Sequence, residues 1–497
     1  MENPSWNSWK NRRYLRPDYT GIPENAMTVR DAFGYLNRIA GVAPLTVPLF
    51  EGDDPVMATP FRVARAAAAA VGFAASAANE IWRLRGGTRQ QISIELKAAA
   101  ASLRSFSFFR RDGQSLPPPW ETNPTVGLYR CGDGRWIHLQ GGFPYLTRRT
   151  LDLLNAANTT ASIASAVAKW NALALEDALA FMNLCGAVAR TDGEWRATVQ
   201  GALLAKTPPI VLKRIGDAPV LRLPETRQPL EGVRVLDFTR VLAGPTVGRT
   251  LASHGAEVLR IRSPKLPTIE LFDLDADVGK RAAFLDLAMP SDAERLRTLA
   301  RGAHVFVDSY RPGALAGLGV TPAALSHSSP GIIYCAVSCY GHQGAWAQRR
   351  GWEQLAQCTT GIAVEQGDYI AAQGGSRRDA VPALISAAVC DYVTGYLGAA
   401  GCAAALLRRF REGGSWLVEV SLSATAMWLR SLGKLPIASM PQSSNLDEGL
   451  DAYLQSCQTA KGLINFLGPV VRMSETPPAW HLPPPEPGEH KPVWLTK

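Results

Sequence analysis

The chain lacks several features that would assign it to a class at once. Its 52 Lys and Arg residues form no basic block along 497 positions, which argues against a nucleic-acid tract. Residues 1–19 carry charges throughout and have no apolar core followed by small residues, so we expect no secretory signal and a cytoplasmic location. The eight cysteines include no paired C-x-x-C, so they are predicted to be reduced core thiols, with no metal site.

Uninterrupted hydrophobic runs of membrane-spanning length are also missing. The nearest approaches are the Ala-rich stretch 66–78, which is short, and the stretch 392–407, which is full of Gly and Ala. Both are predicted to be buried helices, and no membrane partner is expected. The chain does have 46% hydrophobic residues and a net charge of +9. This composition indicates a globular protein of two or three domains and is compatible with an anionic ligand.

An internal repeat emerges when the chain is shifted by 326 residues without a gap. Residues 83–105 (RLRGGTRQQISIELKAAAASLRS) then match residues 409–431 (RFREGGSWLVEVSLSATAMWLRS). Each copy contains the basic end of a Gly/Ala-rich helix, a Gly turn, a short alternating strand and a second helix. Spacing and periodicity agree, so we predict a duplicated helix-strand-helix unit.

A Pro-spaced stretch lies between the two copies and marks a predicted domain boundary. Its five prolines disfavour long helices and central strands. Upstream, alternating runs around residues 132–134 predict a hairpin within a small α+β domain. The predicted division is an N-terminal extension 1–50, an N-terminal half 51–207, a linker 208–229 and a C-terminal domain 230–497.

Downstream of this stretch, strand and helix patterns alternate, which is typical of a parallel sheet. The predicted elements are a strand at 233–238, a helix at 245–254, and strands at 257–261, 304–308 and 332–337. Ser291 and Glu294 predict a capping box at the start of a further helix, and Gly302 predicts its end.

The segment 230–245 (LEGVRVLDFTRVLAGP) places a buried strand before a turn and the start of a helix. Such a turn lies at the carboxyl end of a parallel sheet, where phosphate-bearing ligands bind helix N-termini. The segment lacks G-x-G-x-x-G, so a nicotinamide dinucleotide has little support. Taken alone, it fits an ordinary strand-to-helix turn better than a binding site.

The whole series of motifs changes this interpretation, because it resembles CoA-transferase family III, the CaiB/BaiF family. That family includes formyl-CoA and carnitine CoA-transferases and alpha-methylacyl-CoA racemase. The order and spacing of the motifs over residues 230–480 carry the resemblance. The matching stretches are 235–245 (VLDFTRVLAGP), 255–261 (GAEVLRI), 279–287 (GKRAAFLDL), 305–319 (VFVDSYRPGALAGLG), 333–344 (IYCAVSCYGHQG), 351–361 (GWEQLAQCTTG), 391–404, 417–422 and 468–477.

The resemblance implies an α/β fold with a parallel, Rossmann-like CoA-transferase domain. The N-terminal half is similar to two other parts of the family: residues 61–104 resemble its helix-strand-helix segment, and residues 127–195 resemble its small domain. The chain is thus identified as a rearranged, partly duplicated form. Family members form interlocked dimers, which leaves open both a homodimer and an internal imitation of that contact.

The resemblance also implies a reaction, the movement of CoA from an acyl-CoA to a carboxylic acid. A carboxylate attacks the thioester, and the reaction passes through an acyl anhydride and an enzyme-CoA thioester. The usual Asp of a Gly-Tyr-Asp-like turn is replaced by Glu353, the predicted catalytic residue, and Gly361 is a candidate for oxyanion support. Without the motif, Glu353 fits a surface carboxylate paired with Arg349 or Arg350.

CoA and acyl-CoA are expected as substrates, and no permanently bound cofactor is implied. The residues that the resemblance implies for CoA binding are Val241, Leu242, Ala243, Lys280, Arg281, Ser309 and Tyr310. Lys280 and Arg281 would pair with phosphates, although a solvated loop explains them equally well. Gly317 stands where the family often has a basic residue.

Two rival functions stay open at this point. An acyl-CoA racemase or epimerase would share the fold, but that branch commonly reads Gly-His-Asp where this chain reads Gly-Trp-Glu at 351–353. A non-catalytic acyl-CoA-binding protein would explain the departures from the family pattern. The preferred hypothesis is a CoA-transferase, a transferase of sulfur-containing groups whose partners are acyl-CoA and carboxylic acids.

Overall fold

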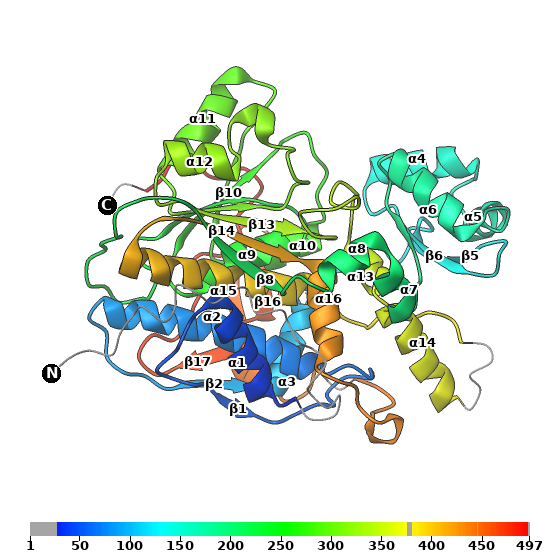
Figure 1. The fold of residues 1–497 in the computed structure, drawn as a ribbon, viewed down its shortest axis with the longest axis horizontal. Coiled ribbons are helices and arrows are strands. Elements are labelled where there is room, and N and C mark those ends of the chain that lie inside the picture. The colour runs from blue at the N-terminus through cyan, green and yellow to red at the C-terminus, as the bar shows by residue number, and fades with distance from the viewer. Residues whose placement is uncertain (1–26, 119, 375–379, 445, 496–497) are drawn as a thin grey trace.

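A computed structural model describes residues 27–118, 120–374, 380–444 and 446–495. Its centre is a seven-stranded sheet in the order β11-β10-β9-β12-β13-β14-β8 (Figure 1). The strands are β8 Ile210–Gly216, β9 Arg234–Phe238, β10 Glu257–Arg262, β11 Arg281–Phe284, β12 Val305–Asp308, β13 Ile333–Ser338 and β14 Ser415–Ser421. All are parallel except β8, which runs antiparallel to β14 at the edge. The predicted α/β class and parallel sheet are confirmed.

Helices cover both faces of this sheet, as a parallel sheet requires. The covering helices are α9 Ala243–Ser253, α11 Pro290–Arg301, α12 Pro322–Ser328 and α15 Val389–Glu412. Val235 and Val305 pack in the core with α9 and α15, whereas Leu236 and Phe306 pack in the core with α11 and α12. Figure 1 shows α11 and α12 on one side and α15 on the other. The alternation of side chains along each strand therefore builds two separate cores.

The start of α11 differs from the prediction. The residue that precedes the helix is Met289, and no side chain caps this end, so the predicted capping box of Ser291 and Glu294 is wrong. Pro290 takes the first helical position, where its missing N–H costs nothing. Gly302 ends the helix as predicted.

The predicted repeat is present in three dimensions. The first copy is α2 Val63–Leu84, β2 Ile92–Glu95 and α3 Leu96–Ala101, and the second is α15, β14 and α16 Leu422–Ser431. Each of α2 and α15 begins with a Val, and these two residues are 326 positions apart. The residues before them have nearly the same backbone angles, φ −82° and ψ 63° at Arg62 against φ −84° and ψ 61° at Ala388. The duplication therefore extends upstream of the matched sequence.

The two Ala-rich helices α2 and α15 pack against each other in the core. Both stretches are buried, as predicted. By length and composition α15 would suit a membrane span, yet its most apolar 18-residue window is 100% buried inside the protein. The small side chains instead allow close approach: a Cβ placed on Gly398 would lie 2.7 Å from Val247 on α9.

The N-terminal and C-terminal halves share sheets as well as this core. One sheet has the order β1-β2-β17 and the other β15-β16-β3-β4. Their remaining strands are β1 Leu49–Glu51, β3 Arg110–Arg111, β4 Gln114–Ser115, β15 Leu454–Thr459, β16 Gly462–Leu467 and β17 Val471–Met473. The expected linker 208–229 also contains β8 of the central sheet. The predicted boundary therefore separates the two repeats in sequence but does not separate two independently packed bodies.

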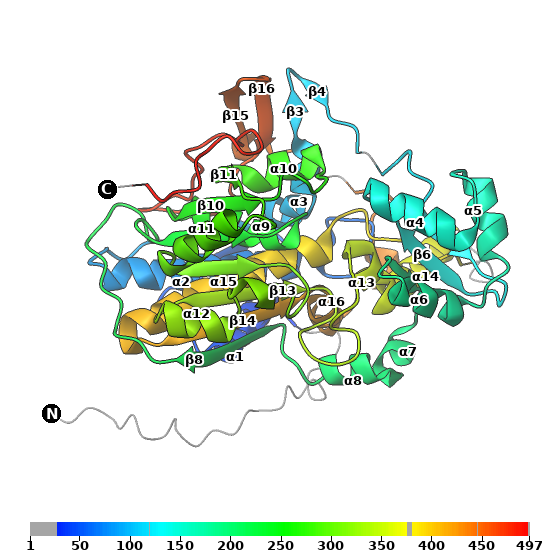
Figure 2. The ribbon, with the colours of Figure 1, turned by 90° about the horizontal axis from the view of Figure 1, so that it is seen from above.

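The small domain lies at one end of the central sheet (Figures 1 and 2). Its strands are β5 Val126–Arg130, β6 Trp136–Gln140 and β7 Gly186–Val188, and its helices are α4 Pro144–Leu154, α5 Thr160–Val167 and α6 Ala172–Phe181. Strands β5 and β6 pair antiparallel around residues 132–134, so the predicted hairpin is confirmed. The other α-helices of the described residues are α1 Val29–Ala40, α7 Asp192–Ala197, α8 Val199–Leu204, α10 Glu270–Asp277, α13 Glu353–Thr359 and α14 Ile362–Gln373.

The eight cysteines are all free, as predicted. Residues 1–26 of the predicted N-terminal extension 1–50 lie outside the described residues.

Candidate active site

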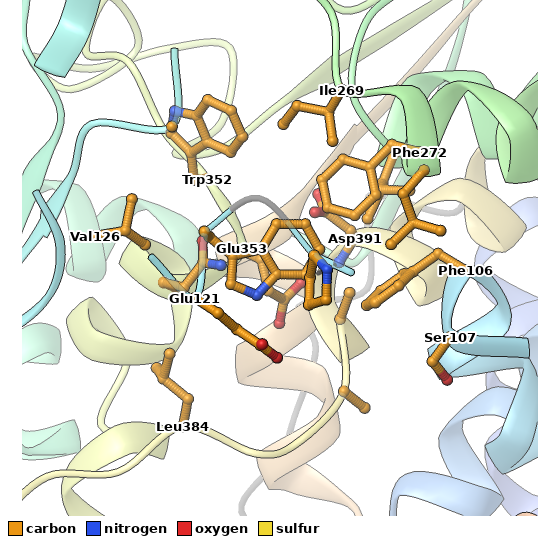
Figure 3. Close-up of a pocket in the computed structure, with 18 of the residues that line it drawn as sticks. Phe106, Ser107, Glu121, Val126, Ile269, Phe272, Trp352, Glu353, Leu384 and Asp391 are labelled. Atoms are coloured by element: carbon orange, nitrogen blue, oxygen red, sulfur yellow. Dashed lines mark hydrogen bonds between the residues drawn. The ribbon is translucent and has the colours of Figure 1, made fainter. Parts of the chain in front are cut away.

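Two cavities meet near the carboxyl end of β9. The larger cavity has a volume of about 890 Å³ and is shown in Figure 3, and the smaller cavity has a volume of about 560 Å³. Four residues line both of them: Val241, Leu242, Trp352 and Asp391. The small domain contributes residues to the walls of both cavities. A ligand long enough to occupy both cavities would pass these four residues.

Asp391 is the third residue of α15 and lies at the junction of the cavities (Figure 3). Its side chain is almost wholly buried, at 7% exposure. Among the described residues, none donates a hydrogen bond to its carboxylate oxygens. Burial, and next the charge of Glu353, raises the pKa of Asp391 well above its usual value. Asp391 is thus a carboxylate with little solvation that faces space for a ligand.

Glu353 begins α13 and is also buried. Its Oε2 accepts the backbone N–H of Asp391 at 2.6 Å, and its Oε1 accepts the backbone N–H of Cys390 at 3.1 Å. Gln357 Nε2 donates to the same Oε1 at 2.7 Å. Burial raises the pKa of Glu353, while these hydrogen bonds oppose the rise. The carboxylate therefore holds the first turn of α15 in place.

These contacts exclude the surface alternative for Glu353. Arg349 pairs with Asp177 at 2.8 Å, and Arg350 donates to the hydroxyl of Tyr145. Neither arginine contacts Glu353 by a hydrogen bond or ion pair within the described chain. The other candidate of this motif, Gly361, lies beside Asp192 and lines neither of the two cavities, so the geometry does not support oxyanion stabilisation by Gly361.

Five of the residues predicted to bind CoA line the smaller cavity. They are Val241, Leu242, Ala243, Ser309 and Tyr310. Val241 has φ +67°, a left-handed conformation that β-branched residues rarely adopt. Such strain persists only where the surroundings impose it, and it concentrates at functional sites. The backbone N–H of Arg240, just before it, donates to Ser309 Oγ at 3.0 Å and helps to fix this turn.

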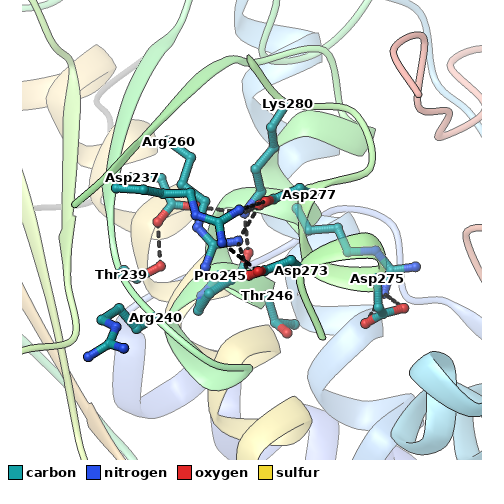
Figure 4. Close-up of polar contacts among 12 residues, drawn as sticks. Asp237, Thr239, Arg240, Pro245, Thr246, Arg260, Asp273, Asp275, Asp277 and Lys280 are labelled. Carbon is teal, nitrogen blue, oxygen red and sulfur yellow. Dashed lines mark hydrogen bonds and ion pairs between the residues drawn. The ribbon is translucent and has the colours of Figure 1, made fainter. Parts of the chain in front are cut away.

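The other two predicted CoA contacts lie elsewhere. Lys280 is 0% exposed, and its Nζ lies 2.6 Å from Asp237 Oδ2 and 2.7 Å from the carbonyl oxygen of Pro245 (Figure 4). Arg281 is buried beside Glu257. Neither residue lines the two cavities. Each of the two residues forms an internal ion pair, because a charge enclosed by a sheet and its helices needs a partner. The structure thus contradicts the phosphate-binding role predicted for them, as well as the solvated-loop alternative.

Three arginines that were not predicted to bind a ligand line the smaller cavity instead. They are Arg240, Arg311 and Arg350. No carboxylate of the described residues forms an ion pair with any of them. Burial, and next the positive charge of Arg350, lowers the pKa of Arg311. Two positive charges that interact within one cavity favour an anionic ligand. Arg240 and Arg311 stand inside stretches that carry the family resemblance, so the signal to find them was present.

The capping geometry at α15 recurs at the start of α2. There Asp54 accepts the backbone N–H groups of Ala64 at 3.0 Å and Arg65 at 3.1 Å. Ala64 and Arg65 stand 326 positions before Cys390 and Asp391. Burial raises the pKa of Asp54 to about 6. The two copies therefore share the capping carboxylate, but Arg65 occupies the place of Asp391.

Comparison with known proteins finds a matching family model and several similar proteins. The model of CoA-transferase family III matches residues 230–433. The acetyl-coenzyme A transferase nodX of Hypoxylon pulicicidum is 31% identical over 62% of this chain and 55% of its own. An acyl-CoA transferase of Gibberella moniliformis is 29% identical over 76% and 72%, respectively. A CAIB/BAIF family protein from Brucella suis of solved structure is 25% identical over 48% of this chain and 65% of its own, with a TM-score of 0.35.

The similarity to CoA-transferase family III is thus concentrated in residues 230–433, which contain six of the seven strands of the central sheet. The chain spans about half the length of several curated relatives that it matches. For example, it is 29% identical to the succinyl-CoA:glutarate CoA-transferase of Mus musculus, and the match covers 40% of this chain and 46% of that protein.

Proposed function

We propose that the protein is a CoA-transferase that moves CoA from an acyl-CoA to a carboxylic acid. The observation that carries the proposal is the position of Asp391, a buried carboxylate at the junction of two cavities with no hydrogen-bond donor among the described residues. One cavity is lined by arginines that suit phosphates. The other has room for an acyl group or an acid.

The geometry favours Asp391 over Glu353 as the nucleophile. Both oxygens of Glu353 accept hydrogen bonds, which stabilise its negative charge and make it a weaker nucleophile than a carboxylate without such donors. The capping carboxylate also recurs at α2 as Asp54, where the neighbouring position is Arg65. A feature shared by both copies fits a structural role, whereas Asp391 distinguishes the copy that lies between the cavities. We therefore assign Glu353 as a positioning residue.

The proposed reaction balances without any further reactant. The Asp391 carboxylate attacks the thioester carbonyl, and the C–S bond breaks to give a mixed anhydride and CoA thiolate. The thiolate then attacks the carbonyl of Asp391, which releases the first acid and forms an enzyme-CoA thioester. The acceptor carboxylate attacks this thioester to form a second anhydride and thiolate. Attack of the thiolate on the new acyl carbonyl releases the product acyl-CoA and restores Asp391.

CoA would occupy the smaller cavity. Arg240, Arg311 and Arg350 would bind its phosphates, and the strained turn at Val241 would let the chain of the ligand approach the backbone. Tyr310 stacks on Phe238 at 4.9 Å between ring centroids, which holds the aromatic face beside the ligand. The substrates are small molecules, the proposed location is the cytoplasm, and a homodimer stays a prediction from the family resemblance.

Trapping of the acyl-enzyme tests this function. The protein is incubated with a panel of acyl-CoAs, treated with hydroxylamine or borohydride, and mapped by peptide mass. We expect an adduct on Asp391 and transfer of CoA to an added acid. Exchange of the substrate α-hydrogen with deuterated solvent, without transfer, would favour the racemase. Tight CoA binding with neither reaction would favour the non-catalytic protein.

Neutralising the arginines of the smaller cavity is expected to weaken acyl-CoA binding. Each of Arg311→Gln and Arg350→Gln removes a charge-assisted phosphate contact, which corresponds to a KM increase for acyl-CoA of roughly tenfold or more. Steady-state kinetics measure it. The matched control is Arg301→Gln, an exposed arginine on α11 that pairs with Glu294. An acyl-pantetheine thioester without phosphates should show no difference between variants, and a difference there would contradict the assignment.

A further inference from the structure

A buried carboxylate on α10, Asp275, lies at the centre of a polar network behind the candidate active site (Figure 4). Its side chain is 0% exposed. Ser105 Oγ donates to it at 2.6 Å, Tyr392 Oη at 2.7 Å and Arg249 Nη1 at 3.2 Å. These donors belong to the first repeat copy, to α15 and to α9, respectively. A buried carboxylate with three donors, one of them a cation, holds its partners in fixed positions.

Tyr392 connects this network to the proposed nucleophile, because it follows Asp391 directly in the first turn of α15. Its hydroxyl donates to Asp275 and also accepts the backbone N–H of Phe106 at 3.2 Å. Burial, and next the charge of Asp275, raises the pKa of Tyr392 well above its usual value, so the hydroxyl keeps its proton and stays a donor. The equivalent position of α2 is Ala66, so only the copy with Asp391 has this hydroxyl.

The segment that contacts this turn is the 3-10 helix η2 Ser102–Phe108, at the end of the first repeat copy. Besides the bond from Phe106, the backbone N–H of Ala388, just before α15, donates to the carbonyl oxygen of Leu103 at 3.0 Å. Three residues of η2 line the larger cavity, namely Arg104, Phe106 and Ser107. The start of α15 is therefore held both by Glu353 of α13 and by a wall of this cavity.

The second repeat copy shows the same segment without these contacts. Its helix α16 is regular, and Ser431 Oγ donates to the carbonyl oxygen of Trp428 within that helix at 2.6 Å. Ser105 stands 326 positions before Ser431, yet it bonds to Asp275. In the first copy the α-helix gives way to η2, where Arg104 has non-helical backbone angles, φ −126° and ψ 24°. The first copy therefore departs from the second where it contacts α15.

We infer that Tyr392 and Asp275 are positioning residues, which hold Asp391 in place against the wall of the larger cavity. This inference rests on the proposed function, since it takes Asp391 as the nucleophile. Neither Tyr392 nor Asp275 lines the two cavities, so both act through the turn that they hold. A shift of about 1 Å in a reacting group can cost about a hundredfold in rate. The wall is held as well, because Phe106 stacks on Tyr392 at 6.3 Å and contacts Phe272 at 5.2 Å between ring centroids (Figure 3).

The variant Tyr392→Phe tests this role, because it removes the hydroxyl and keeps the ring beside Phe106. We expect kcat to fall about tenfold, while KM for acyl-CoA stays within about twofold of the wild type. The rising limb of the pH profile should not move, since burial and the charge of Glu353 raise the pKa of Asp391. A merely structural defect would instead lower the number of active sites, which the adduct on Asp391 counts, and leave the rate per site unchanged.

A double-variant cycle shows whether the effect passes through Asp275. Ser105→Ala removes a second donor to the same carboxylate and should lower kcat about threefold. Combined with Tyr392→Phe, it should cost less than the product of the two single losses, because both act on one network. The matched control is Tyr453→Phe, which also removes a buried tyrosine hydroxyl that donates to a carboxylate of the other half, Glu95 at 3.3 Å. It should keep the wild-type kcat, because Tyr453 lines neither of the two cavities.

A kcat of Tyr392→Phe within about twofold of the wild type would overturn the inference, as would losses in the cycle that multiply. The adduct on Asp391 would still form in these cases, so the proposed function would stand. A wild-type protein with neither transfer nor an adduct on Asp391 would contradict the proposed function itself. Thermal unfolding checks that each variant is folded. If Tyr392→Phe does not fold, Ser105→Ala decides alone: an unchanged kcat overturns the inference, and a reduced kcat with an unchanged KM for acyl-CoA supports it.

Discussion

Replacement of Asp391 by Asn is expected to lower turnover by roughly 10⁴-fold or more, because it removes the group proposed to form the anhydride. Glu353→Gln is expected to lose less, about tenfold to a hundredfold, since a Gln still offers a carbonyl oxygen to the backbone of α15 and changes only the position and charge around Asp391. Steady-state kinetics and adduct mapping of both variants measure the difference.

The pH profile separates a nucleophile from a residue that acts on it. Attack requires ionised Asp391, and its pKa is raised, so kcat/KM should rise with pH up to that raised value. The charge of Glu353 contributes to the rise. Glu353→Gln should therefore move the rising limb to lower pH, whereas a purely structural loss would reduce activity at every pH alike. An adduct on Glu353 together with an active Asp391→Asn would restore the assignment made from the sequence.

Asp391→Asn should also stabilise the folded protein. Because the folded-state pKa of Asp391 lies above the unfolded value, the native state binds the extra proton, and stability falls as pH rises between the two values. Asn removes this cost, so Asp391→Asn should gain about 0.5–2 kcal/mol in free energy of unfolding at neutral pH. The gain should shrink toward pH 4. Chemical denaturation at several pH values measures it, and a constant gain would contradict this origin.

The strands of the central sheet could be predicted because their signals are local. Residues 233–238 and 257–261 are short runs in which apolar residues predominate, one on each side of a helix, and they form buried strands of a parallel pair. The predicted cap of α11 failed because Pro290 already sets the start of that helix. The fusion of the two halves was also beyond local signals, since β2 and β17 pair from opposite ends of the chain.

The candidate site was predicted in part, since a motif gives a residue type but not its surroundings. Glu353 was predicted to be the catalytic residue, and it lines the larger cavity, but two of its three hydrogen-bond partners lie on α15, whose sequence indicated only an apolar helix. The matched stretch 391–404 begins with Asp391, but the sequence did not indicate that this residue lines the cavities. Lys280 has a side chain that suits phosphates, yet the fold encloses it.

Lys280→Met is expected to destabilise the protein by about 3–5 kcal/mol, since it leaves Asp237 as a buried charge without its cation. Both side chains of the pair are 0% exposed. The hydroxyl of Thr239 still donates to Asp237, but a neutral donor does not replace an ammonium group. Urea unfolding measures the loss. KM for acyl-CoA should stay near the wild-type value below the unfolding temperature, because Lys280 lines neither of the two cavities.

A second substitution distinguishes an unpaired charge from a simple packing defect. The double variant Asp237→Asn with Lys280→Met removes the buried charge of Asp237 but keeps a side chain of the same size at position 237. Size matters there because Asp237 packs tightly on Gly248: a Cβ on Gly248 would lie only 2.6 Å from Asp237 Oδ2. We expect the double variant to recover roughly half or more of the lost stability, a non-additivity typical of contacting ionic partners. Additive losses would indicate that packing of the Lys280 stem dominates. A stable Lys280→Met with a raised KM for acyl-CoA would show instead that this lysine reaches the ligand, as the sequence alone suggested.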